Sequence, residues 1–444
     1  MKLRKSAISV EMLFLIVFLP VISVSYADDA SVLPKGVSRV MLDSNFYFPV
    51  DQRYGPDGGA EDVAADYNRS LNSSVFSALA PLDPFVPGLP SIGDSIVSFQ
   101  YHFTMLNLGF QYGVTDKLSM GITIPYWWIE NDVEARLDSG TGSSANVGKN
   151  PCFGAAGCPS TSPIIPIASG GVRMDTEDVQ ALLGRGLDVN GDGTIDIAGF
   201  QFDRFESWSY RGLSDIEAGF KYRYLKTDDW RLAVTGGAKF PTGRVDDPDN
   251  LTDYGSGANA YILAFRLHND YILSNLWKAQ HRSDGGAATG DSGLGDVVLN
   301  GTVRYDVVLP DRPEKRVPGN VNNPVTANKE RVRRDMGDNV ELEFAAKYAA
   351  VVPGLHVSAI YKYAFKMKDR VSGSSGFAYE SLEAETARTE QIYTLGLSYT
   401  TMPLFVAKKF PVPLTASVAY RDRFAGSNNI LKSKYITAGL QVFF

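Results

Sequence analysis

The sequence predicts an all-β fold, a closed antiparallel transmembrane β-barrel of about 12 strands with long extracellular loops. Three observations predict it. Apolar and polar residues alternate in segments of about ten residues, the length at which a tilted strand crosses a bilayer. Short and long connections alternate along the chain, which is typical of membrane barrels. The last segment, Tyr435 to Phe444, is a bare hydrophobic strand, and pairing with the first strand would remove its exposed edge.

The strand candidates follow one another along the whole chain. They are the segments 36–48, 99–112, 118–128, 216–224, 230–240, 261–268, 297–307, 340–348, 355–366, 393–400, 414–421 and 435–444. Residues 270–295 lie where a short connection is expected, and a further hairpin there would give about 14 strands as the alternative. A soluble β-sandwich also alternates, but here the polar faces carry charges at strand centres, which favours the barrel.

Two local features refine the second and third candidates. Phe99 to Met105 alternate in one phase and Leu106 to Tyr112 in the other, which predicts a β-bulge between them. Tyr126, Trp127 and Trp128 end the next strand and predict an aromatic girdle at the membrane boundary.

The N-terminus has the pattern of a secretory signal peptide. Basic residues precede an apolar run from Met12 to Val24, and Ser25-Tyr26-Ala27 is a small-x-small cleavage site. The expected organisation is therefore a signal peptide (1–27) and a barrel (28–444), with an extracellular insertion at 131–211. The net charge of −7 and the absence of a basic tract argue against a nucleic-acid partner.

Several segments resemble a known family. LPKGVSR (33–39), YGVTDKLSMGITIPY (112–126), GLSDIEAGFKYRYL (212–225), AVTGGAKFPTGR (233–244) and the final LQVFF resemble the outer-membrane family labelled for the meta-pathway of phenol degradation. The resemblance covers most of the mature chain but not the insertion. It implies a transport barrel in the outer membrane of a Gram-negative bacterium, with hydrophobic or aromatic solutes. It also implies that Phe444 is recognised by the barrel-insertion machinery, and it carries over no binding residue.

The polar faces place an excess of cations in the lumen. The candidate solute-binding residues are Arg39, Lys221, Arg223, Arg231, Lys239, Arg266, Arg304, Lys347 and Lys362. One hypothesis is a narrow pore that prefers anionic or carboxylated solutes, because confined cations attract them. The other is a salt-bridged wall that selects nothing.

The insertion contains a motif that is typical of a calcium loop of the EF-hand or dockerin kind. Its oxygen ligands would be Asp188, Asn190, Asp192, Thr194 (through its carbonyl) and Asp196. Gly193 permits the sharp turn, and residues 176–183 before the loop are predicted to form a short helix. Gly199 replaces the usual acid at the twelfth position, so we expect a structural Ca²⁺ to bind weakly.

Cys152 and Cys158 are the only cysteines, and an exported compartment is oxidising, so a disulfide is expected. It would stabilise its small loop by roughly 2 kcal/mol in the chain-entropy model. No GxSxG motif accompanies the histidines, so no enzyme is predicted.

The predicted function is an outer-membrane channel for the passive uptake of small solutes, either aromatic or hydrophobic, or anionic. The alternative is a structural or surface-binding barrel with a plugged lumen, whose large loops bind a partner. A remote alternative is an outer-membrane lipid hydrolase.

Overall fold

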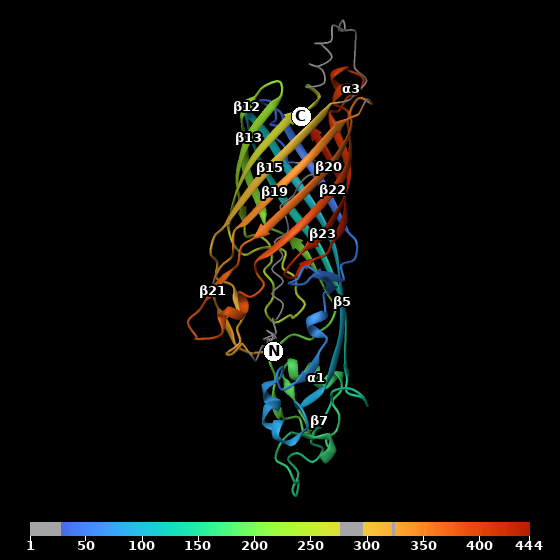
Figure 1. Ribbon diagram of the computed structural model, residues 1–444, viewed down its shortest axis with the longest axis vertical. Helices are drawn as coiled ribbons and strands as arrows, with labels where there is room; N and C mark the ends of the chain where they lie inside the picture. The colour runs from blue at the N-terminus through green and yellow to red at the C-terminus, as the bar shows by residue number, and fades with distance from the viewer. Residues whose placement is uncertain (1–27, 276–295, 322–324, 351) are drawn as a thin grey trace, which may run out of the picture.

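The computed structural model describes residues 28–275, 296–321, 325–350 and 352–444. Within these ranges, twelve strands form a closed antiparallel barrel (Figure 1). They are β1 (Ser38–Tyr47), β5 (Ser91–Thr115), β6 (Leu118–Asp138), β12 (Ile216–Lys226), β13 (Trp230–Phe240), β14 (Ile262–Ile272), β15 (Val297–Val308), β19 (Asn339–Ala349), β20 (Leu355–Lys366), β22 (Arg388–Thr400), β23 (Leu414–Gly426) and β25 (Lys434–Phe443). The predicted all-β barrel of 12 strands is confirmed.

The barrel closes where its last strand meets its first. β25 pairs with β1 in a continuous register, from Phe443 opposite Arg39 to Tyr435 opposite Tyr47. The aggregation-prone edge of the terminal strand is thereby removed, as predicted. Two further strands, β4 (Ser70–Asn72) and β11 (Trp208–Leu213), pair with the outer parts of β5 and β6 but add no member to the ring. The further hairpin considered for 270–295 falls mostly on residues 276–295, outside the described ranges.

Alternation along each strand separates an apolar outer face from a polar inner face. On β14, Leu263, Phe265 and Leu267 are 37–52% exposed on the outside, whereas Arg266 and His268 turn inward. Successive side chains of a strand point to opposite faces, so this pattern covers the barrel with an apolar belt. Other strands carry the same belt, with exposed Leu42, Phe46, Phe110, Ile122, Phe220, Leu299, Val303, Phe344, Leu395, Leu397, Val418, Ile436 and Leu440.

Most short turns lie at one end of the barrel, as predicted. The connection 401–413 lies there too, and so does the connection 273–296, of which only residues 273–275 and 296 are in the described ranges. Six other connections lie at the opposite end, namely 48–90, 139–207, 241–261, 309–338, 367–387 and 427–433. They gather at the lower end of Figure 1, and we call this end the outer end. The C-terminus and the short turns, including that between β5 and β6, lie at the other end, which we call the inner end.

β5 and β6 extend far beyond the rest of the barrel (Figure 1). β5 has 25 residues, so at about 3.3 Å per residue it is roughly 80 Å long, more than twice the thickness of a bilayer core. The predicted β-bulge after Met105 is wrong, because the pairing with β6 is continuous from Asp94 to Gly113. The apolar side chains change faces there because the outer part of β5 packs inward, whereas the inner part presents its apolar residues on the barrel exterior.

The connections at the outer end contain the remaining short elements. They are β2 (Gln52–Tyr54), β3 (Ala60–Asp62), η1 (Ala65–Tyr67), η2 (Ser77–Phe85), β7 (Val147–Lys149), β8 (Ile164–Pro166), η3 (Ile167–Ser169), α1 (Thr176–Leu183), β9 (Gly186–Leu187), β10 (Ile197–Ala198), β16 (Glu314–Arg316), β17 (Lys329–Arg331), β18 (Arg333–Asp335), β21 (Arg370–Ser372), η4 (Tyr379–Leu382) and β24 (Ile430–Leu431). The short helix α3 (Met402–Val406) lies at the inner end. None of the helices in the described ranges has the length and apolarity that a membrane-crossing helix needs.

The first two long connections fold together into a small domain at the tip of β5 and β6, which we call the cap (residues 63–97 and 133–207). Its core buries Phe76, Leu79, Ile92, Val147 and Met174, each at most 2% exposed. The predicted helix of the insertion is α1, which begins with a reciprocal capping box between Asp175 and Asp178. The insertion itself is shorter than predicted, because β6 continues to residue 138 and β11 begins at residue 208.

Candidate functional site

The lumen contains the first described residues of the chain. Asp28 lies among the inward side chains of four strands, where its carboxylate is 2.6 Å from Arg266 Nη1 and 2.9 Å from Lys221 Nζ. The Thr302 hydroxyl donates a hydrogen bond of 2.6 Å to the Asp28 carbonyl. The Asp28 N–H donates to Glu343 at 2.9 Å. The start of the described chain is therefore bound on all sides by the barrel wall.

The residues after Asp28 lead from this point to the inner end of the barrel. The Asp29 carboxylate lies 2.6 Å from Lys347 Nζ, and the N–H of buried Ala30 donates to Asp270 at 3.2 Å. The Leu33 N–H donates to Ser119 on β6 at 2.8 Å. Residues 28–37, which we call the N-terminal segment, thus fill part of the lumen.

Several of the predicted lumen cations are paired with carboxylates. Lys221, Arg266 and Lys347 contact the N-terminal segment, Arg304 pairs with Asp306 at 2.6 Å, and Lys362 pairs with Glu341 at 3.1 Å. Lys239 is buried, Arg39 contacts Gln111 and Gln441, Arg223 donates to the Asp116 carbonyl, and Arg231 lies opposite Lys226 near the inner end. Asp28 and Asp29 thus offset part of the cation excess that the sequence predicts.

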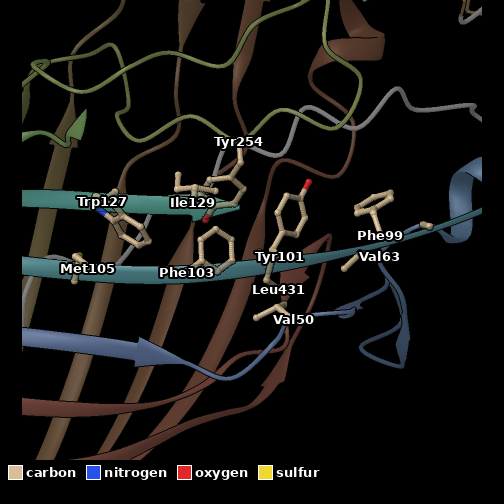
Figure 2. Close-up of a cluster of buried hydrophobic side chains, with 11 residues drawn as sticks. Val50, Val63, Phe99, Tyr101, Phe103, Met105, Trp127, Ile129, Tyr254 and Leu431 are labelled. Carbon is tan, nitrogen blue, oxygen red and sulfur yellow. The ribbon is translucent and has the colours of Figure 1, made fainter. Parts of the chain in front are cut away.

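An aromatic cluster fills the outer mouth of the barrel (Figure 2). Tyr101 and Phe103 project from β5 toward Tyr254, with ring centroids 5.7 and 4.9 Å from that ring. Trp127 on β6 packs edge-on against Phe103 at 5.9 Å and is 1% exposed. Trp127 therefore belongs to the mouth, although its neighbours Tyr126 and Trp128 stack with each other at 4.7 Å on the other face of β6.

Tyr254 reaches this cluster because the 241–261 connection folds back over the mouth. The Tyr101 hydroxyl donates a hydrogen bond of 2.9 Å to the Thr252 carbonyl. Arg244 forms a bidentate ion pair with Asp253, with N–O distances of 2.5 and 2.6 Å. Burial raises the pKa of Tyr254, so its hydroxyl stays neutral at physiological pH. The lumen is thus occupied at two levels, by the aromatic cluster at the outer mouth and by the N-terminal segment further in.

The predicted calcium loop lies in the cap as a tight, exposed turn. Asp188 accepts backbone N–H groups of Gly191 and Gly193, and Asp192 accepts that of Thr194, which lowers the pKa of Asp192. Within the described ranges, no three His, Cys, Asp or Glu side chains are grouped so that they could hold a metal ion. Calcium binding by Asp188, Asn190, Asp192, Thr194 and Asp196 stays a prediction.

The predicted disulfide also lies in the cap. Cys152 and Cys158 are joined, with Cα atoms 5.5 Å apart. The amide of buried Asn150 donates to the Ser160 and Ser162 carbonyls and so supports the small loop that the disulfide closes. This segment is held by local contacts and lies away from the lumen.

Sequence reasoning missed two parts of the site. The N-terminal segment gave no strand pattern, and only the acidic pair Asp28-Asp29 next to a cation-rich lumen could have indicated it. Residues 99–105 contribute part of the aromatic cluster through their inward phase, but the same phase shift also predicts a bulged strand, which the structure does not contain.

Comparisons with known proteins complete this description. No family model matches the chain, and no curated protein matches it. Among solved structures, it is similar to an outer membrane channel from Pseudomonas putida F1, with 11% identity, 94% of this chain and 99% of that chain covered, and a TM-score of 0.46. It is also similar to a FadL homologue from Pseudomonas aeruginosa, with 9% identity, 92% of this chain and 90% of that chain covered, and a TM-score of 0.31. The NanC porin has 8% identity, 78% of this chain and 98% of that chain covered, and a TM-score of 0.32. The function proposed below therefore rests on the geometry of this chain.

Proposed function

We propose that this protein is a channel in the outer membrane of a Gram-negative bacterium that takes up small solutes passively. The observation that carries the proposal is the closed barrel with an apolar belt outside and charged side chains inside. An apolar outer wall of this kind is stable in a lipid bilayer. A charged interior is typical of a barrel whose lumen conducts solutes or contains a plug. The signal peptide at 1–27 and the recognition of Phe444 by the barrel-insertion machinery belong to the same proposal.

Both the N-terminal segment and the aromatic cluster at the outer mouth must move for solute to pass, and the N-terminal segment is the one that charge pairing holds in place. Its two carboxylates contact Lys221, Arg266 and Lys347, so its departure would remove two negative charges from beside these three cations, while Arg266 keeps its ion pair with Glu217 at 3.1 Å. Confined cations attract anions, which supports anionic or carboxylated solutes. The aromatic cluster at the outer mouth supports solutes with an apolar or aromatic part, in line with the family resemblance.

Cleavage after Ala27 would strengthen the hold on the segment. The Asp28 nitrogen, 2.9 Å from Glu343, would become the α-ammonium of the mature chain and form an ion pair in place of a neutral hydrogen bond. Three ion-paired groups would then stabilise the closed state, namely the α-ammonium and carboxylate of Asp28 and the carboxylate of Asp29.

Single-channel recording in planar bilayers tests this function. The expected result is discrete openings with anion preference, because Lys221, Arg266 and Lys347 lose their contacts with Asp28 and Asp29. Openings without ion preference would keep the channel and overturn the role of the cations. A silent protein that is folded, as shown by its heat-modifiable gel shift, would contradict the channel.

The second candidate is a structural or surface-binding barrel with a plugged lumen. The packed aromatic cluster and the folded cap favour it, because both close the outer end with ordered protein. This candidate predicts no conductance from either wild type or a variant without the contacts of Asp28 and Asp29. Release of fatty acid from phospholipid vesicles would instead mark the remote lipid hydrolase.

A further inference from the structure

The cap and neighbouring connections form a half-open cavity of about 140 Å³ next to the aromatic cluster. Its floor is the inward face of the β5–β6 extension, where Val97 lies opposite Ala135. α1 covers it with Val179 and Leu183, and Phe205 comes from the chain that returns to the barrel. Segments that are far apart in sequence thus build one cavity, at the part of β5 and β6 that extends beyond the rest of the barrel.

The size and lining of this cavity select a small apolar guest. Its walls are mainly aliphatic and aromatic side chains, and its Thr176 and Gln180 hydroxyl and amide groups already bond to the backbone of Leu137 and Phe205. An apolar protein cavity of about 150 Å³ holds one benzene molecule. The space here therefore fits a molecule built on a single ring or a chain of similar volume.

Two cations line the same cavity, and one of them, Arg136, is exposed. The Arg69 side chain is half-buried, its Nε is shielded from solvent, and it forms no hydrogen bond or ion pair within the described ranges. The neighbouring acid Asp66 is already engaged by Arg53 at 2.6 Å. A guanidinium whose Nε is shielded from water and has no protein partner gains from a bound carboxylate, with which it forms short charge-assisted bonds.

We propose that this cavity is a binding site for a small apolar monocarboxylic acid, whose ring or chain packs between Val97, Ala135 and Val179 and whose carboxylate meets Arg69. Tyr67 lines the cavity and also packs against Phe99 of the aromatic cluster at 5.7 Å. The site therefore borders the outer mouth of the barrel. Binding here does not require conduction, so the inference stands or falls separately from the channel.

Equilibrium binding to the full-length protein in lipid nanodiscs tests it, with empty nanodiscs as the blank. The probes are benzoate, its neutral isostere benzamide, and acetate, which has the carboxylate without the ring. We expect one saturable benzoate site per chain by calorimetry, about tenfold weaker binding of benzamide, and at least about a hundredfold weaker binding of acetate.

Variants assign the site. Ala135→Leu and Val179→Phe fill the cavity from opposite walls and should each abolish benzoate binding. Arg69→Gln should weaken benzoate about tenfold and leave benzamide unchanged. The matched controls are Glu134→Gln, an exposed neighbour that does not line the cavity, and Arg185→Gln, an exposed cap cation away from it.

Three outcomes would contradict the proposal. No benzoate binding at millimolar concentration removes the site. Binding that survives both filling variants lies elsewhere on the protein. Equal affinity for benzoate and benzamide, unchanged by Arg69→Gln, removes the carboxylate from the ligand class.

Discussion

Arg266 Nη1 on β14 lies 2.6 Å from Asp28 Oδ2, so a wall cation in the lumen is neutralised by the first described residue of the chain. The same carboxylate contacts Lys221 on the second strand over, which joins the N-terminal segment to two strands at once. A contact of this kind closes the lumen by charge pairing, and charge pairing can be exchanged for a contact with an anionic solute. This relationship explains why the predicted cation excess does not appear as open positive wall.

The apolar belt gives the first prediction. Leu395 on β22 is 55% exposed on the outer face, and Leu395→Lys should destabilise the barrel by about 2–4 kcal/mol if that face meets lipid near the bilayer midplane. Unfolding in urea with lipid vesicles measures the change. The control is Ser375→Lys at an exposed position of the 367–387 connection, which should change stability little. Equal effects of the two variants would contradict a lipid-facing belt.

The second prediction concerns the link between cap and barrel connections. Arg316 on β16 is buried, bonds to Asp249 at 2.6 Å and to the Phe200 and Gln201 carbonyls, and lies 3.8 Å from the ring of Phe202. Arg316→Met removes the donor from the two carbonyls and leaves Asp249 with Lys329 alone, which should cost about 1–3 kcal/mol in local opening. Hydrogen exchange at residues 200–202 measures the loss.

The matched control for that link is Arg312→Met, an exposed arginine four residues earlier in the same connection. It should leave the exchange rates unchanged. Unchanged exchange in Arg316→Met as well would show that other contacts hold the connections together.

The third prediction is a pH dependence in the connections at the outer end. Glu330 accepts the Ser374 N–H and the Tyr379 hydroxyl, and these bonds lower its pKa to about 2, first through the Ser374 backbone. A lowered pKa stabilises the contact above the ordinary glutamate value of about 4.3, and the contact is lost as pH falls through about 2. Exchange of the Ser374 amide should stay slow at pH 4 in the wild type.

Glu330→Gln separates charge from shape in this contact. Above about pH 2 the variant should protect the Ser374 amide less than the wild type, relative to the intrinsic exchange rate, and this protection should not depend on pH. Slow exchange at pH 4 in both proteins would mean that the carboxylate charge is not what holds the two connections.

The fourth prediction concerns the acidic loop of the cap. Calcium should bind with a dissociation constant on the order of 10⁻⁴–10⁻³ M, because Gly199 supplies no bidentate acid. Calorimetry should show one site that Asp188→Asn and Asp192→Asn remove. Asp83→Asn, an exposed acid elsewhere in the cap, should retain it. Binding that persists in the two loop variants would place the ion elsewhere.

Strand number and closure could be predicted because each barrel strand alternates within itself. An example is β22, where the exposed apolar residues Leu395 and Leu397 alternate with the buried polar residues Thr394 and Ser398. A short stretch of sequence is enough to show this alternation. The path of the N-terminal segment could not be predicted, because it depends on side chains of Lys221 and Lys347 that lie far away in sequence. No periodic pattern records such contacts.

The cap shows the same limit in another form. The helix at 176–183 followed from its cap residue, but the cavity needs Val97 and Ala135 of the strands, α1, and the chain near Phe205 together. The sequence shows that the apolar residues change faces after Met105. A local pattern cannot distinguish a bulged strand from a regular strand that extends beyond the membrane, so it predicts a bulge that β5 does not have.

Single-channel conductance of wild type and the Asp28→Asn/Asp29→Asn variant tests the central claim most directly. Each lost charge-assisted contact contributes about 1.5–3 kcal/mol, so the open probability of the variant should rise by at least about tenfold, with anion preference. Asp83→Asn serves as the control and should behave as the wild type. A folded variant that stays silent, or that opens no more often than the wild type, would contradict a channel closed by its N-terminal segment.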